Sequence, residues 1–388
     1  MSIRTISARL WSAVTSLKLT IACLVLLMVL VVACTLAQVR LGTLGAVDAY
    51  IRSLLVVWKV PGTAFSIPVF PGGALVGLVL AVNLVAAQVN HYQLGWHKAG
   101  LWVVHAGLIL LLAGEFVTGL FQVEMQLPIE QGQTLDFIES RRDVELALVD
   151  TTNPANDDVY GIPESLLASR QPIAIPGTGI AIRVHSFLRN VELLRSGPGA
   201  PPSQATAGVG AEVSVRELSP ATGDDQSDVR AALVEPSTAG HSYGVWLVST
   251  GLAAPQSFVH EGRTYALSMR PARQYLPYSL TLKKFSHDVY AGTDIPKNFS
   301  SLVHVSDASR AQERDVLISM NQPLRYAGKA FYQASFGKGD TLSVLQVIDN
   351  PGWLLPYISC LLVGAGLVLH FALSLGRSLR RHSAALEA

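Results

Sequence analysis

The sequence predicts a membrane α-helical bundle of four spans that carries a large extracytoplasmic all-β domain. The 388 residues are 50% hydrophobic and only 15% charged, with a mean hydropathy of +0.37, which is too apolar for an ordinary soluble protein. The apolar excess is concentrated in four stretches near the two ends of the chain. The middle, residues 122–350, instead has short β-prone runs separated by turn residues.

Residues 1–18 are expected to form a cytoplasmic tail and residues 19–37 the first span. The run from Leu19 to Ala37 holds no charged residue, and about 20 apolar residues cross roughly 30 Å of hydrocarbon. A signal peptide that ends near Cys34 is an alternative interpretation. The apolar run continues past Cys34 and further spans follow, which favours a transmembrane helix.

The remaining elements follow from the same criterion. Residues 38–72 are expected to form an outer loop, in which Ala46 to Val60 is a candidate amphipathic helix on the membrane surface. Three further spans are predicted, with their connections, from the apolar runs and the polar segments between them: spans 73–89, 100–121 and 351–376, the cytoplasmic turn 90–99 and the cytoplasmic tail 377–388.

Basic residues flank the first and the last span. Arg4, Arg9 and Lys18 precede the first, and an arginine cluster that begins at Arg377 follows the last. Lys and Arg gather on the cytoplasmic side of membrane proteins, so both ends are expected in the cytoplasm. The loop 38–72 and the domain 122–350 are then expected outside, on a protein of the inner membrane.

The outer domain is predicted from β-prone runs bounded by Gly, Pro, Asn and Asp. These runs are Val144 to Val149, Ile180 to Phe187, Tyr278 to Phe285 and Thr341 to Ile348, and the Pro/Gly/Ser-rich or acidic stretches 196–209 and 219–228 are expected to be exposed loops. The three cysteines, Cys23, Cys34 and Cys360, all lie in the spans, so this domain supplies no thiol. A net charge of +1 argues against nucleic acid as a partner.

Three histidines near the cytoplasmic side are candidate binding residues. His105 lies about 7 Å inside the third span. A histidine at that depth either hydrogen-bonds a neighbouring helix or ligates a cofactor such as haem iron. His370 is expected at a similar depth, and His97 lies in the inner turn, where it is either interfacial or lines an entrance.

Glycines and aromatic residues allow similar alternatives. Gly100, Gly107 and Gly114 give the third span a smooth face, on which another helix or a flat macrocycle can lie, helix packing being the commoner cause. In the outer domain, alternating aromatics form either strand core or a stacking patch, and core is the commoner case: Tyr326, Phe331, Tyr332 and Phe336. His185, His241, His260, His287 and His304 lack metal-ligand spacing and are expected to be surface or strand residues.

Two stretches near the C-terminus carry a family resemblance. They are YSLTLKKFSHDVYAGTDIPKNFSSLVHV from Tyr278 and NQPLRYAGKAFYQASFGKGD from Asn321, followed by the closing span after Asn350. They resemble the ResB (CcsB) family, whose pattern contains "Y-G-T-x-x-P-K-x-F-x-S" and "N-x-P-L-x-Y-x-G-x-x-F-Y-Q-x-S". The N-terminal layout agrees, including a second span with Asn83-Leu84 and a third with an early histidine followed by glycine.

The resemblance implies a subunit of the System II cytochrome c synthase. Such a subunit works with CcsA (ResC) to carry haem b outward and join it to the CxxCH thiols of apocytochrome c. The sequence has no tryptophan-rich WWD segment, so CcsA is expected as a separate chain. His105 matches the family's transmembrane haem-ligand histidine, and His97 and His370 are further candidate haem contacts. The chain is then a non-catalytic or co-catalytic part of a haem lyase complex.

Two other functions stay open. A membrane-anchored b-type cytochrome that moves electrons would need facing histidine pairs at two depths, whereas His105 and His370 are expected at one depth. A structural scaffold without haem would use His105 only for packing.

Overall fold

The computed structural model describes residues 3–59, 65–90, 96–195, 197, 201–221, 228–290, 292 and 296–386. These residues divide into two compact units. The helical unit holds the described residues up to Gln122 and from Asn350 onward, and the β unit holds the described residues from Val123 to Asp349.

The helical unit contains the predicted spans. Its helices are α1 (Ile3–Val14), α2 (Leu17–Ala46), α3 (Gly73–Asn90), α4 (Ala99–Phe121) and α6 (Leu355–Leu386). Among the described residues, four helical segments are long and apolar enough to cross a membrane: Leu17–Thr43, Gly73–Asn90, Ala99–Phe121 and Leu355–Arg380. The predicted fold class, a four-span helical bundle with a large β domain, is confirmed.

The segment between α2 and α3 differs from the amphipathic helix expected over 46–60. After the π-helical turn η1 (Val47–Ile51) the chain forms a hairpin of β1 (Leu55–Lys59) and β2 (Ser66–Pro71). Four β-prone residues in a row open β1, and its hydrogen-bonding partner lies on the other side of the turn. A strand therefore replaces the second half of the expected helix.

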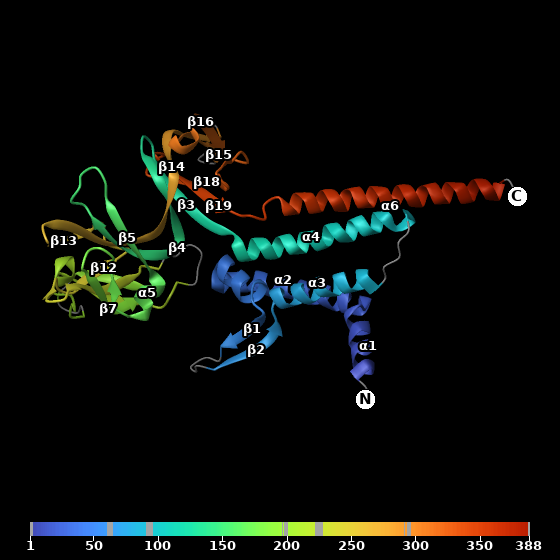
Figure 1. Cartoon of the computed structure of the whole chain (residues 1–388), viewed down its shortest axis with the longest axis horizontal. Helices are drawn as coiled ribbons and strands as arrows, with labels where there is room; N and C mark the ends of the chain where they lie inside the picture. Colours follow the sequence, from blue (N-terminus) through green and yellow to red (C-terminus); the bar gives the residue numbers. More distant parts are fainter. Residues whose placement is uncertain are drawn as a thin grey trace. The chain divides into compact units, whose positions relative to one another are not determined.

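The glycine stripe of α4 packs against α6, and the two helices run antiparallel side by side (Figure 1). A Cβ added at Gly100 would lie 2.4 Å from the backbone nitrogen of His370, and one at Gly114 would lie 2.9 Å from Leu355 Cβ. In return, Gly366 of α6 approaches the backbone of Val104. Only glycine permits such close approach of two helices, so the helix-packing interpretation of the stripe is confirmed.

The chain leaves and re-enters the helical unit at one end of this helix pair. The side-chain amide of Asn350 donates hydrogen bonds to Thr118 Oγ1 at 3.2 Å and to Gln122 Oε1 at 3.4 Å. The Gly352 N–H in turn donates to Asn350 Oδ1 at 2.8 Å, just before α6 begins. Asn350 therefore holds the C-terminal end of α4 beside the N-terminal end of α6.

The β unit is built around a ten-stranded antiparallel sheet in the order β16-β15-β14-β4-β3-β19-β18-β17, with β13 and β5 added on β14 and β4. Its strands are β3 (Val123–Glu130), β4 (Thr134–Asp150), β5 (Asp158–Pro163), β13 (Gln256–His260), β14 (Arg263–Val289), β15 (Pro296–Asp307), β16 (Gln312–Ser319), β17 (Leu324–Tyr326), β18 (Lys329–Gly337) and β19 (Leu342–Asp349). All four predicted β runs are strands.

A second sheet, in the order β11-β10-β7-β6 with β12 on β10, covers one part of the first. It contains β6 (Ile173–Ala174), β7 (Ala181–Leu188), β10 (Ala231–Thr238), β11 (His241–Ser242) and β12 (Trp246–Ser249), and β8 (Val191–Arg195) pairs with β9 (Val213–Glu217). Short helical segments, α5 (Glu164–Ser169), η3 (Gly208–Ala211) and η4 (Ala308–Arg310), connect these strands.

The long strands β4 and β14 are shared by two separate cores. One core fills the space within β3, the second half of β14, β15 and β17 to β19, around Phe331 and Leu345. The other lies between the first half of β14 and the second sheet, around Tyr265 and Trp246. Bulges in the β4–β14 pairing separate the halves and let one pair of strands serve both cores.

Most described residues of the stretch 196–209, expected as an exposed loop, are exposed. Ala205 and Ala207 are half-buried against the cores of the β unit, and Gly210, just after the stretch, is buried. Residues 196, 198–200 and 222–227 of the two expected loops lie outside the described residues.

Candidate functional site

His105 of α4 has one of its two ring nitrogens already engaged. Its Nδ1 lies 2.7 Å from the carbonyl oxygen of Leu101, one helical turn earlier. A carbonyl oxygen only accepts hydrogen bonds, so Nδ1 carries the proton and the neutral ring keeps its lone pair on Nε2. Within the described part of the chain, Nε2 has no hydrogen-bond partner. Histidines that bind metals are commonly oriented in this way by a backbone carbonyl.

His105 lies on a face of α4 that does not contact α6. At 100° per residue it is about 140° around the helix from Gly100, which packs on α6. It is only about 20° from Phe116, whose ring lies 4.0 Å from a Cβ added at Gly77 of α3. His105 therefore shares the side of α4 that α3 approaches.

His370 lies on the opposite side of α4 from His105. Its backbone covers Gly100, and its Nδ1 is buried without a hydrogen-bond partner among the described residues. The structure therefore does not bring His105 and His370 to one point, although both belong to the helical unit. The two imidazoles face different surroundings.

The third candidate, His97, lies in the 3-10 turn η2 (Trp96–Lys98) that leads into α4. The side chain of His97 and the whole of His91, in the same inner turn, lie outside the described residues. The backbone of η2 runs beside α6, so it lies at the same end of the helix pair as Gly100 and His370.

The residues present fit a haem that takes one axial ligand from this chain. Haem iron is held in proteins by imidazole nitrogens among other ligands. His105 offers a lone pair on Nε2 and a fixed ring orientation through Leu101. Helix α6 covers the glycine stripe, so a haem macrocycle cannot lie on it.

The two stretches of the family resemblance meet inside the β unit. Ser301 of β15 donates a 2.7 Å hydrogen bond to Gln333 Oε1 of β18, and the Ser301 and Ser343 hydroxyls lie 2.8 Å apart. Gln333 Nε2 donates to Ser343 Oγ at 3.1 Å. Ser301 and Ser343 are fully buried. The polar motif residues Ser301 and Gln333 thus join β15 to β18 and β19, which is a structural role.

Two motif tyrosines pack edge to face in the same core. The rings of Tyr278 and Tyr326 lie 4.8 Å apart, and Tyr326 donates a 2.7 Å hydrogen bond to the buried carboxylate of Asp307. Burial raises the pKa of Tyr278 to about 12. Tyr326 and Phe331 are buried, which confirms the core interpretation for both, while Phe336 keeps 38% of its surface exposed.

The outer histidines differ in their surroundings. His185 pairs with Glu235 at 2.8 Å, and His304 lies between Asp315 and Glu313, both on the surface of strands. His260 is buried and satisfied by Tyr243 and Thr178. Among the described residues there is no cluster of three His, Cys, Asp or Glu side chains that could hold a bare metal ion.

His287 is the residue that sequence reasoning set aside. It sits near the end of β14, with Nδ1 3.2 Å from Asp340 and its ring stacked on Phe299 at 4.9 Å. Metal-ligand spacing is a pattern of neighbours along the chain, whereas Asp340 lies in another hairpin, the turn between β18 and β19. The position of His287 inside the first motif stretch is the available signal.

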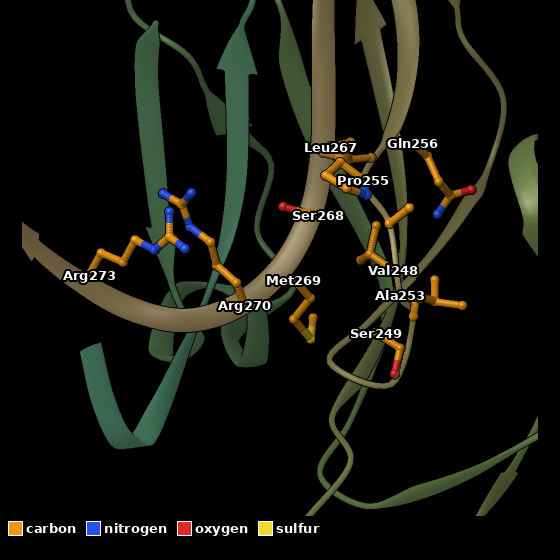
Figure 2. Close-up of a pocket in the computed structure, with 12 residues that line it drawn as sticks. Val248, Ser249, Ala253, Pro255, Gln256, Leu267, Ser268, Met269, Arg270 and Arg273 are labelled. Carbon is orange, nitrogen blue, oxygen red and sulfur yellow. The ribbon is translucent and has the colours of Figure 1, made fainter. Parts of the chain in front are cut away.

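A pocket of about 280 Å³ lies beside the first half of β14. Figure 2 shows Arg270 and Arg273 pointing toward one another at one end of it, with Met269 and Val248 along the wall. Arg270 donates to Glu145 and Arg273 to Glu139, each at 2.9 Å. Both arginines are thus neutralised, which leaves the pocket without a net charge to attract an anion.

Comparison with protein families gives a match to the second half of the β unit. The model of the ResB-like family matches residues 239–344, from the β10–β11 turn into β19. Protein NrfI of Wolinella succinogenes is 31% identical over 102 residues, which is 26% of this chain and 11% of NrfI. The matched part of NrfI is therefore a small share of its length.

The fold defines a multispan membrane protein with a large β domain inserted between its third and fourth candidate spans. Residues 239–344 are similar to the ResB-like family, and this region contains the buried Ser301–Gln333–Ser343 network.

Proposed function

We propose that this chain is the ResB-type subunit of a System II cytochrome c synthase. It helps to carry haem b across the membrane and positions it, together with apocytochrome c, for thioether attachment with a CcsA/ResC-like partner. The observation that carries the proposal is the hydrogen bond from His105 Nδ1 to Leu101, which leaves Nε2 as a ligand for iron inside an apolar span.

The second axial ligand comes from the partner in this proposal. His370 lies on the α6 side of α4, and His105 lies about 140° away around the helix. One haem would not be held by both, because α4 lies between the two imidazoles. His370 and His97 remain haem contacts of a different kind, at the end of the helix pair where the chain turns from α3 to α4.

The division of work between the two units follows from their chemistry. Haem supplies the iron and the vinyl groups, and apocytochrome c supplies the thiols, since the β unit contains no cysteine. This chain holds the macrocycle through His105 and provides a folded outer surface for the client. Catalysis by such an arrangement is mainly proximity and orientation of the two reactants. The large domain lies on the extracytoplasmic side, as the arginines in the C-terminal part of α6 favour.

The test is purification of the chain with its CcsA-like partner, as wild type and as His105→Ala. Loss of bound haem b from the absorption spectrum, together with loss of cytochrome c maturation in cells, is the expected result. His185→Ala is the matched control, because that exposed imidazole pairs only with a surface glutamate. Normal maturation with unchanged haem content in His105→Ala would reject the proposal. Haem loss with normal maturation would favour a b-type cytochrome instead.

A further inference from the structure

His287 of the β unit has the same half-engaged ring as a metal-binding histidine. Its Nδ1 lies 3.2 and 3.3 Å from the two carboxylate oxygens of Asp340. A carboxylate accepts hydrogen bonds, so Nδ1 carries the proton. Nε2 is buried and has no hydrogen-bond partner within the described ranges. Buried polar nitrogens are nearly always paired, so an unpaired one points to a missing ligand.

Aromatic rings surround this imidazole. Phe299 stacks on it at 4.9 Å and Phe336 lies 4.5 Å from it, with the two phenyl rings 5.0 Å apart. Phe285 stacks on Phe336 from the core side at 5.9 Å. Phe336 has 38% of its surface exposed, whereas Phe285 is buried. Phe336 is thus the ring beside the imidazole that solvent reaches. A planar ligand would displace this ring to reach the imidazole.

The donor set selects one class of ligand. A bare transition-metal ion needs three or four protein ligands, and no such cluster exists among the described residues. Haem brings four nitrogens of its own and needs only an axial ligand and apolar, stacking surroundings. The exposed Lys297, two residues before Phe299, adds a positive charge that suits a haem propionate.

We propose that His287 Nε2 is an axial ligand for haem on the β unit, held in its tautomer by Asp340 and flanked by Phe299 and Phe336. The inference rests on the proposed haem-handling function and adds a second haem-binding site to it. The haem bound here is the one that has already left the site at His105. Asp340 is a positioning residue, because it acts on the iron only through the imidazole.

The experiment is a titration of ferric haem into the full chain in detergent, without the partner. Variants are His105→Ala, His287→Gln, the double variant and, as control, His241→Ala, an exposed ring that meets Tyr243 edge to face. Gln at 287 keeps a donor toward Asp340 and so preserves the local fold. The readouts are the number of imidazole-ligated haems from the Soret band and, in electron paramagnetic resonance, the high-spin ferric signal of haem with a single imidazole ligand, with empty micelles subtracted.

Two haems in the wild type and in His241→Ala, one in each single variant and none in the double variant are expected. Two haems in His287→Gln would overturn haem binding at His287 and leave the proposed site at His105 standing. Two haems in His105→Ala, with one in His287→Gln, would overturn the His105 site and leave this inference standing. No ligated haem in the wild type would overturn both.

Asp340→Asn gives an independent readout. A carboxylate partner makes imidazole a stronger donor and favours ferric iron, so the amide should raise the reduction potential of the haem at His287. In the His105→Ala background only that haem is present, and its potential is measured directly. An unchanged potential would contradict ligation through the Asp340–His287 pair.

Discussion

The side-chain amide of Asn83 donates a hydrogen bond to the carbonyl oxygen of Val14 at 2.6 Å. The same nitrogen reaches Ser16 O at 3.2 Å, and Thr20 Oγ1 donates to Asn83 Oδ1 at 2.6 Å. Asn83 is fully buried in α3, yet its donors and acceptor are used at the break between α1 and α2. It thereby satisfies carbonyls that the end of α1 leaves without helical partners.

Replacing Asn83 by leucine should therefore weaken the contact between α3 and the junction of α1 with α2. The change keeps the branched skeleton of four side-chain heavy atoms but leaves two carbonyls and a threonine hydroxyl without this partner, at a cost of about 1–3 kcal/mol for each group that stays buried. Unfolding in mixed detergent, followed by circular dichroism, measures the loss. Asn90→Leu is the control, since Asn90 pairs with Trp11 at the exposed end of the same helix. Equal stability of the two variants would contradict the role of Asn83.

Gly107→Ala should separate α4 from α6. Its added Cβ would lie 2.8 Å from Val363 Cγ2 and 3.0 Å from both Ser359 O and Val363 N, so backbone as well as side chain must move. Overpacking of this kind costs about 1–3 kcal/mol. Gly119→Ala in the same helix is the matched control, because no described atom beyond its neighbours lies within 4 Å. Disulfide trapping between cysteines placed on α4 and α6 reports the separation, and an equal yield in both variants would contradict it.

Gln333→Leu should destabilise the β unit without touching its surface. Ser301 loses the acceptor of its 2.7 Å hydrogen bond, and Ser343 loses a donor, both in the buried interior. The expected loss is about 1–3 kcal/mol in the free energy of unfolding. Urea denaturation followed by tryptophan fluorescence measures it. Gln346→Leu is the control, since Gln346 bonds only the surface residue Glu124, and its midpoint should stay near wild type.

The stability of the β unit should depend on pH through His304. Hydrogen bonds to Asp315 and then Glu313 raise the pKa of His304. A bond from Lys283, then one from His304, lowers the pKa of Asp315. The histidine contribution is complete below its unfolded pKa of about 6.5 and disappears as pH rises through the raised folded value. The carboxylate contribution is present above about pH 4 and disappears as pH falls through the lowered value.

His304→Gln should therefore lower the melting temperature most between about pH 5 and 6.5, and progressively less at higher pH. Thermal unfolding of wild type and variant across this range gives the difference curve. His185→Gln serves for comparison, because its pairing with Glu235 lies on another sheet. A difference that grows above pH 7 would have the wrong sign for a raised pKa and would contradict the assignment.

The sequence was most informative where a single local property decides the structure. The uncharged run from Leu19 to Ala37 is enough to predict a span, because length and hydropathy alone determine crossing. The glycine spacing in α4 predicted a smooth helix face, and the structure gives that face to α6. The β-prone runs became strands for the same reason, since alternation and turn residues are local signals.

The sequence alone does not show which distant segments of the chain pair with one another. Ala46 to Val60 is a candidate helix by sequence, whereas Leu55 to Lys59 in fact pairs with Ser66 to Pro71 as a strand. The sequence predicts His287 to be an ordinary surface or strand histidine. Asp340 and Phe336 come close to it only because β14, β15 and β18 fold together. The depth of His105 and His370 was predicted to be similar, but which side of α4 each occupies depends on how α4 packs on α6.

The contact of Asn350 with Thr118 and Gln122 also sets an order of events during synthesis. Helix α4 leaves the ribosome with its glycine face uncovered, and α6 cannot reach that face until all of residues 123–349 has been made. At about 5–20 residues per second this interval lasts roughly ten to forty-five seconds. During that time the glycine face of α4 is without α6, and the main sheet is without β19, which is made directly before α6.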